Sequence, residues 1–379
     1  MKEADSLKSV RELFDKKLGF GMMRLPVNDV NEVDEARVNE MVDEFISNGF
    51  NYFDTAYVYH GGKSEEVVRK CLVERYDREK FILATKLPSF IIEKAEEMPT
   101  IFNTQLERCG VSYFDLYLVH ALNAKDYEKM NGFKAFEFVQ DLKNEGKVKY
   151  MGFSFHDKAE VLDKILNEHP EVDFVQLQIN YYDWEKDNVE AHKCYDVAAK
   201  HNVPIIVMEP IKGGSLIDLP NSAMKLLDSY DGSPASLAIR YVASKPQVMM
   251  VLSGMSSLEQ MKDNISYMKE LKPITEKEEA LTEEIVKIID SIPTVPCTGC
   301  KYCIDGCPMK IRINAMFSLY NDDMKFHKGE PNKKAYERIA RDEYGKASDC
   351  VKCGACEGVC PQHLPIRDNL EMIAKTYEI

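Results

Sequence analysis

The sequence predicts an α/β fold, a (β/α)8 (TIM) barrel followed by a small domain that is rich in cysteine. Between about residues 18 and 268, short β-branched or aromatic runs alternate with longer amphipathic stretches, as expected for about eight βα units. Eight of the eleven cysteines follow residue 296. The 379 residues are enough for two domains, and we expect the barrel in residues 1–290 and the second domain in residues 291–379.

The expected strands are apolar along both faces, which is typical of parallel strands covered by helices. We expect strands at 18–21, 51–54, 81–86, 114–119, 149–153, 174–178, 204–208 and 248–252. We expect helices at 34–49, 64–75, 97–109, 131–144, 157–167, 187–201 and 234–244. An open doubly wound sheet is the competing architecture, but no G-x-G-x-x-G follows the first strand.

Two capping-box patterns predict where late helices begin. They are Ser256-x-x-Glu259 and Thr275-x-x-Glu278. The second helix is expected to run to about residue 290, where prolines break the chain before the first cysteine group. The predicted domain boundary lies there.

The composition argues against several classes of partner. A net charge of -14 does not suit a nucleic-acid binder, which needs a concentrated Lys and Arg surface. No apolar run approaches the ~18 residues that a membrane span requires. The first residues lack the basic and apolar segments of a secretory signal, so we expect a cytoplasmic protein without nucleic-acid or membrane partners.

The cysteines after residue 296 form one motif that occurs twice. It reads Cys297-x-x-Cys300-x-x-Cys303-x-x-x-Cys307-Pro308 and then Cys350-x-x-Cys353-x-x-Cys356-x-x-x-Cys360-Pro361. In two-cluster ferredoxins, the fourth cysteine of such a run binds the other cluster. We therefore predict two [4Fe–4S] clusters, with the fourth cysteines exchanged. One is expected on Cys297, Cys300, Cys303 and Cys360, and the other on Cys350, Cys353, Cys356 and Cys307.

Zinc sites and disulfides are the alternatives for these cysteines, but structural zinc prefers paired C-x-x-C groups to a run of four that ends in Cys-Pro. About forty residues separate the two motifs, and the segment 335–344 looks helical. The second domain therefore resembles the α-helical dicluster ferredoxin domain. Its clusters imply one-electron transfer.

Four polar residues stand at or just beyond the carboxyl ends of consecutive predicted strands, where barrel active sites lie. They are Asp54, Tyr59, Lys86 and His120. A lysine beside a tyrosine lowers the pKa of the phenol, and an aspartate keeps that lysine charged. A histidine polarises a carbonyl oxygen. The four predict a proton donor for carbonyl reduction, with Tyr59 as the general acid.

The segment from Asn51 to Tyr59, followed by Ser64-Glu65, resembles the signature of the aldo-keto reductase family. The Gly19-Phe20-Gly21 start and the strands that end in Lys86 and His120 are also similar. The whole chain resembles the subgroup with a C-terminal ferredoxin-like extension. The resemblance implies hydride transfer between NADP or NAD and a small carbonyl or alcohol substrate, with the four residues as the catalytic tetrad.

The resemblance also implies ten cofactor-binding positions. They are Ser154, Gln176, Met208, Pro210, Ile211, Gly213, Gly254, Ser256, Gln260 and Asn264. Ser154 and Gln176 match the positions that hold the nicotinamide carboxamide, although Phe155 replaces the usual asparagine. Met208 stands where an aromatic ring typically stacks on the nicotinamide. Asn264 matches an adenine contact, on a helix whose N-terminus suits a phosphate.

The choice between NADP and NAD stays open. Gly254 and Gln260 stand where the family often has basic residues that clamp the 2′-phosphate. Lys212 and Lys262 are the alternative cations.

Two further functions remain open beside the reductase hypothesis. In the first, the chain is an electron-transfer protein that passes electrons from NAD(P)H through the clusters to a redox protein partner. A flavin would be expected between NAD(P)H and the clusters, although no flavin motif is visible. The second is a non-catalytic redox sensor.

His60 and His156 are expected on loops at the same rim of the barrel, whereas Cys71, Cys109 and Cys194 are expected to pack in the core.

Overall fold

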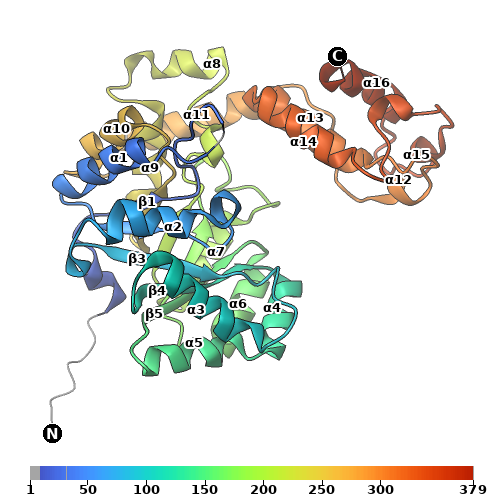
Figure 1. The fold of residues 1–379 in the computed structure, drawn as a ribbon. Coiled ribbons are helices and arrows are strands. Elements are labelled where there is room, and N and C mark those ends of the chain that lie inside the picture. The colour runs from blue at the N-terminus through green and yellow to red at the C-terminus, as the bar shows by residue number, and fades with distance from the viewer. Residues whose placement is uncertain (1–8, 31, 379) are drawn as a thin grey trace, which may run out of the picture. The chain divides into compact units, whose positions relative to one another are not determined.

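The computed structural model describes residues 9–30 and 32–378. Eight parallel strands pair in sequence order, and the eighth pairs with the first to close a barrel (Figure 1). The strands are β1 (Leu18–Gly21), β2 (Tyr52–Asp54), β3 (Ile82–Leu87), β4 (Phe114–Leu122), β5 (Val148–Phe155), β6 (Phe174–Gln178), β7 (Ile205–Met208) and β8 (Val248–Ser253). The closed order confirms the predicted barrel and excludes the open sheet.

Helices cover the strands and build the C-terminal region. The α-helices are α1 (Glu35–Ser47), α2 (Ser64–Val68), α3 (Glu97–Cys109), α4 (Ala124–Gly132), α5 (Ala135–Asn144), α6 (Ala159–Glu168), α7 (Ala191–Lys200), α8 (Asn221–Met224), α9 (Pro234–Ala243), α10 (Leu258–Met268), α11 (Glu276–Ser291), α12 (Tyr302–Asp305), α13 (Ile313–Phe326), α14 (Glu330–Ile339), α15 (Ala355–Gly358) and α16 (Ile366–Tyr377). Short 3-10 helices lie at Val10–Leu13, Tyr59–Gly62, Arg78–Lys80, Lys212–Gly214, Lys225–Ser229 and Ala347–Asp349, and a π-helical turn at Arg69–Val73.

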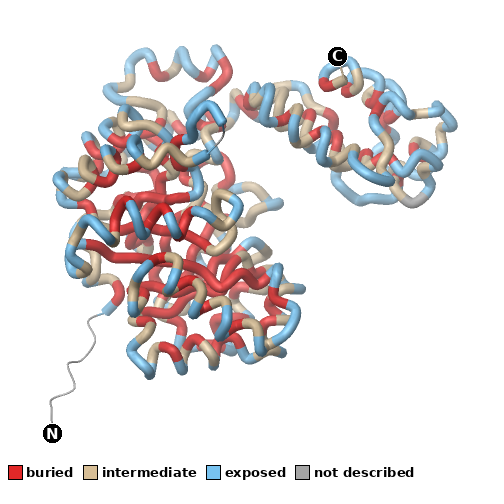
Figure 2. The backbone as a smooth tube through the Cα atoms, viewed as in Figure 1, coloured by how far each residue is buried: buried red, intermediate tan, exposed pale blue. Residues whose placement is uncertain are grey.

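Burial follows the strands. Figure 2 shows buried residues along the barrel strands, while exposed residues lie on the outer sides of the surrounding helices. Every residue of β2, β3 and β8 is buried, as the apolar strand patterns predict. The three cysteines outside the repeated motif, Cys71, Cys109 and Cys194, are buried and unpaired. In the described part of the chain, no helix is long and apolar enough to cross a membrane.

Most predicted elements agree with the structure, and the differences have local causes. The helix expected at 131–144 is two helices, because Lys134 adopts a left-handed φ of 59° between α4 and α5. The Asn123 side chain, which accepts from the amide of Asp126, marks the unpredicted start of α4. The helix expected at 335–344 ends at Ile339. Beyond it the chain turns so that the Gly345 amide donates to the Met309 carbonyl at 3.1 Å.

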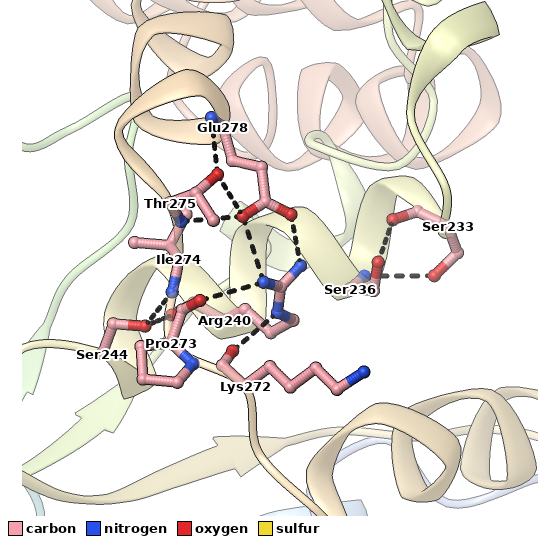
Figure 3. Close-up of polar contacts among 9 residues, drawn as sticks. All are labelled: Ser233, Ser236, Arg240, Ser244, Lys272, Pro273, Ile274, Thr275 and Glu278. Carbon is pink, nitrogen blue, oxygen red and sulfur yellow. Dashed lines mark hydrogen bonds and ion pairs between the residues drawn. The ribbon is translucent and has the colours of Figure 1, made fainter.

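One of the two predicted capping boxes begins its helix as expected. The Thr275 amide donates to Glu278 Oε2 at 2.7 Å, and the Glu278 amide donates to Thr275 Oγ1 at 3.3 Å (Figure 3). Arg240 Nη1 and Nη2 add hydrogen bonds to the same carboxylate at 2.6 and 3.1 Å. The other prediction is wrong by one residue. Ser257 rather than Ser256 caps α10, because the Ser256 hydroxyl donates to a backbone carbonyl of another loop.

The chain forms two compact units. The first comprises Met1–Gly213 and Asp231–Glu279, and the second comprises Gly214–Tyr230 and Ala280–Ile379. In the second unit, Ile313, Met316 and Phe317 of α13 belong to one apolar core together with Leu370 and Ile373 of α16. Helix α11 runs across the change of unit, so the boundary placed at residue 290 stays a prediction.

Candidate active site and cysteine-lined cavities

An ion pair lies buried at the carboxyl ends of β2 and β3. Asp54 is the last residue of β2 and pairs in register with Ala84, so Lys86 follows two residues further along β3. Lys86 Nζ is 2.5 Å from Asp54 Oδ1 and donates to the Thr55 carbonyl at 2.7 Å. Burial lowers the pKa of Lys86, but Asp54 and Tyr59 raise it above its ordinary value, which keeps the ammonium charged.

Tyr59 lies over this pair. It begins the 3-10 helix after β2, and Lys86 Nζ is 4.9 Å from the centroid of its ring. Burial raises the pKa of the Tyr59 phenol, and Lys86 opposes that rise. The expected lowering by lysine is therefore present but smaller than the effect of burial. The phenol stays protonated at neutral pH.

The fourth predicted residue, His120, completes the group from β4. Its ring centroid is 6.0 Å from that of Tyr59, with the rings at 77°. Burial, followed by the charge of Lys86, holds the pKa of His120 well below its ordinary value, so the imidazole is neutral. Its Nδ1 has no hydrogen-bond partner within residues 9–30 and 32–378. All four residues expected from the sequence thus meet at one point.

A buried polar network behind Lys86 was not anticipated. Gln105 Nε2 on α3 donates to the Lys86 carbonyl at 3.0 Å and to Glu65 Oε1 at 2.8 Å. Thr85 donates to the same Glu65 oxygen at 2.7 Å, and Tyr117 donates to Gln105 Oε1 at 2.6 Å. The Ser64-Glu65 pair was visible in the sequence, but its partners come from separate elements. The network holds the backbone at Lys86 in place.

The loops at the rim contribute one unpredicted aromatic side chain. Phe90 follows β3, is 46% exposed, and its ring centroid is 5.6 Å from that of His120. His60 Nε2 accepts a hydrogen bond from the Leu25 amide at 3.1 Å, so it holds the loop after β1. His156 is exposed and lines an open cavity of about 160 Å3 together with Cys194.

The predicted carboxamide ligands lie next to each other on β5 and β6. Ser154 and Gln176 pair in register, and both are buried. The Ala121 amide donates to Ser154 Oγ at 2.7 Å. Gln176 Oε1 has no hydrogen-bond partner among the described residues. A buried acceptor of this kind fits the amide group of a nicotinamide.

The remaining predicted cofactor positions follow β7 and β8. Met208 ends β7, Pro210 and Ile211 follow it, and Gly213 has a left-handed φ of 62°. Around α10, the Ser256 amide donates to Gln260 Oε1 at 2.7 Å, while Gly254 lies in the loop before the helix.

Asn264 is buried and already bonded within the protein. Its amide nitrogen donates to Ser253 Oγ at 2.7 Å, and its oxygen accepts from Tyr267 at 2.5 Å. Of the two lysines considered as phosphate ligands, Lys212 forms an ion pair with Asp183 at 2.7 Å, and Lys262 is exposed. A cation that the sequence reasoning missed, Arg24, lies beside Gly254 and Gly213.

The cysteines of the repeated motif line two cavities in the second unit. Cys297, Cys300, Cys303 and Cys360 line one cavity, and Cys307, Cys350, Cys353 and Cys356 line the other. These are the two groups expected from the exchanged fourth cysteines. In the described residues, no three His, Cys, Asp or Glu side chains lie close enough together for a single metal ion. Four cysteines around one cavity fit a cube in which each iron takes one thiolate.

Comparison with known proteins gives one family match for the barrel and another for the cysteine-rich region. Residues 17–287 match the Aldo/keto reductase family. The chain belongs to the aldo/keto reductase family. Residues 296–364 match the 4Fe-4S dicluster domain. The protein is thus an oxidoreductase of the aldo/keto reductase family with a C-terminal dicluster region.

Individual relatives of this aldo/keto reductase are distant but cover most of the barrel. An uncharacterized oxidoreductase of Bacillus subtilis is 24% identical over 73% of this chain and 92% of its own length. A holo-form aldo-keto reductase from Bacillus halodurans is 26% identical, with a TM-score of 0.57, and the match covers 71% of this chain and 91% of that one. A Klebsiella pneumoniae aldo-keto reductase solved with NADPH is 18% identical, with a TM-score of 0.57 over 71% of this chain and 90% of that one.

Proposed function

We propose that the barrel catalyses NAD(P)-dependent reduction of a small carbonyl compound, or oxidation of the corresponding alcohol, with Tyr59 as the proton donor. When bound, the nicotinamide supplies or accepts the hydride. The observation that carries the proposal is the buried Lys86–Asp54 pair, with Nζ and Oδ1 2.5 Å apart, next to the rings of Tyr59 and His120. The NADPH found in the Klebsiella neighbour supports the choice of a nicotinamide cofactor.

Each side chain of the tetrad has a separate role. Tyr59 holds the proton that passes to the carbonyl oxygen, because its phenol is protonated in the free enzyme. The Lys86 ammonium stabilises the phenolate that remains, and Asp54 keeps that ammonium charged and fixed. His120 is neutral, so its imidazole N–H is available to orient the carbonyl oxygen without adding a charge.

The cofactor positions are part of the same proposal. Ser154 and Gln176 Oε1, which has no partner among the described residues, are assigned to the carboxamide, with Met208 against the ring. The segments with Pro210, Ile211 and Gly213 and with Gly254, Ser256, Gln260 and Asn264 are assigned to the rest of the dinucleotide.

A conservative variant tests the role of the phenol. Tyr59→Phe is expected to lower kcat by about 10²- to 10⁴-fold, because it removes general acid catalysis and keeps the ring. The assay follows NADPH and NADH oxidation by anaerobically purified protein with a panel of aldehydes and ketones. Tyr57→Phe, two residues away in the same loop, is the matched control and keeps its activity. Equal rates in Tyr59→Phe and in the native chain contradict the proposal.

In the second unit we propose two [4Fe–4S] clusters, which supply one-electron transfer when bound. The four-cysteine lining of each cavity supports this assignment. Cys300 and Cys353 are exposed, so each proposed cluster has an edge at the surface. That exposure favours a second function, electron exchange with a redox protein partner. Anaerobic titration with NADPH and NADH, followed by electron paramagnetic resonance, tests it. If the clusters stay oxidised while the nucleotide is oxidised in the reduction of a carbonyl substrate, an electron path from the barrel to the clusters is contradicted.

A further inference from the structure

The Arg24 side chain lies where the loops after β1, β7 and β8 meet. Its stem runs along Gly254, where an added Cβ would lie 3.2 Å from Arg24 Cδ and 3.3 Å from Cγ. Its guanidinium reaches Gly213, where an added Cβ would lie 3.1 Å from Nη2. Glycine at both positions therefore leaves the space that the arginine occupies.

The backbone around Arg24 is held from two other loops, whereas its charged end is open. The Ser256 hydroxyl donates to the Arg24 carbonyl at 2.7 Å, and the amide of Leu25 donates to His60 Nε2 at 3.1 Å. The Arg24 side chain is nevertheless 47% exposed. A fixed base with an exposed guanidinium is suited to binding a ligand.

The Arg24 guanidinium has N–H donors that are free to bind a ligand. A guanidinium carries five N–H donors. In the described residues its polar partner is Glu209, whose Oε1 is 3.8 Å from Nη2, which is beyond hydrogen-bond distance. Glu209 itself follows β7 with a left-handed φ of 56°, a conformation that is uncommon outside glycine. The carboxylate thus lies near the arginine as a counter-ion and leaves its donors unused.

Among the described residues, no carboxylate lies within hydrogen-bond distance of the Arg24 guanidinium, unlike Lys212 in the loop after β7. Lys212 is held by Asp183 at 2.7 and 3.0 Å. The nearby N-terminus of α10 adds a favourable dipole for an anion, in the same loop as Ser256.

We propose that Arg24 binds a phosphate group of the dinucleotide and that Glu209 is the internal anion which this phosphate replaces. The inference rests on the proposed function, since it assigns the cation of the same cofactor site. Arginine suits this task because its planar fork binds phosphate oxygens through two hydrogen bonds. The phosphate is either the diphosphate, which NADH and NADPH share, or the 2′-phosphate of NADPH alone.

The test measures nucleotide dissociation constants of the full, anaerobically purified chain by quenching of nucleotide fluorescence, for NADPH and for NADH separately. Arg24→Gln is expected to weaken binding by about 10- to 100-fold, the loss expected for a charge-assisted pair of hydrogen bonds. Glu209→Gln is expected to tighten binding by about two- to fivefold, because it removes the competing anion. Arg69→Gln is the control, since Arg69 is 48% exposed and paired with Glu74 at 2.8 Å away from this loop.

The opposite signs of the two variants separate ligand binding from a structural role. Weakening for both nucleotides supports binding of the diphosphate, and weakening for NADPH alone supports binding of the 2′-phosphate. If Arg24→Gln binds both nucleotides as the native chain does, the inference is overturned while the proposed function stands. If Glu209→Gln weakens binding as Arg24→Gln does, the pair only braces the loops, and the inference is again overturned. If the native chain binds neither nucleotide, the proposed function fails and the inference fails with it.

Discussion

Removing the carboxylate from the buried Asp54–Lys86 pair tests whether the pair is ionised. The two side chains are 3% and 1% exposed, and Asp54→Asn leaves the Lys86 ammonium with neutral acceptors, such as the Thr55 carbonyl at 2.7 Å, and without a carboxylate. Leaving one charge of a buried pair without its partner costs about 3–5 kcal/mol. We therefore expect Asp54→Asn to lower the free energy of unfolding of the barrel unit by that amount.

The double variant Asp54→Asn/Lys86→Met is expected to be more stable than Asp54→Asn alone, because it buries no unpaired charge. Urea unfolding followed by tryptophan fluorescence measures this in the barrel unit, since Trp184 is the one tryptophan of the chain. Glu128→Gln is the matched control. It removes a partner of Lys164 in a pair whose side chains are 64% and 48% exposed, and should cost at most about 1 kcal/mol. Two results would refute the reasoning. One is a loss of unfolding free energy for Asp54→Asn as small as that of the control. The other is a loss for the double variant that equals the sum of the losses for Asp54→Asn and Lys86→Met alone.

Three further predictions concern other parts of the chain. Hydrogen bonds from Arg240 hold the pKa of Glu278 at about 2, below its usual 4.5, so the pair's contribution is complete above pH 4.5 and is lost as the pH falls toward 2. Arg240→Leu should therefore remove about 1–2 kcal/mol at pH 7, after allowance for solvent screening, and less at pH 3, measured by urea unfolding at both values. Cys360→Ser should change the paramagnetic resonance signal and the iron content of the proposed cluster on Cys297, Cys300 and Cys303, and should leave the other cluster unchanged. Loss of both clusters would contradict the idea that each cavity holds its cluster independently. Gly152→Ala should destabilise the barrel by about 1–3 kcal/mol, because its Cβ would lie 2.6 Å from the Phe174 carbonyl oxygen, and an unchanged melting temperature would contradict this.

Local patterns in the sequence were sufficient for the fold and for the main chemical groups. The strand of 174–178 and the helix of 97–109 agree with the structure at both ends, because apolar runs and amphipathic periodicity reflect burial directly. The convergence of Asp54, Tyr59, Lys86 and His120 was predictable for a related reason. Residues at the carboxyl ends of consecutive parallel strands must meet at one end of a barrel. The exchanged cysteine groups followed from the spacing of a motif that occurs twice.

The parts that the sequence did not reveal depend on contacts between distant segments. Gln105 supports Lys86 through hydrogen bonds that join α3 to β3, and nothing local to Gln105 marks it. Arg24 looks like one more surface arginine until the loops after β7 and β8 place two glycines beside it. The direction of the Tyr59 pKa was also decided by the fold, because burial, which depends on every surrounding element, outweighs the lysine beside it. The sequence by itself thus determined which chemical groups are present and on which strands. The tertiary structure decided their surroundings, since burial and long-range partners arise only when the barrel closes.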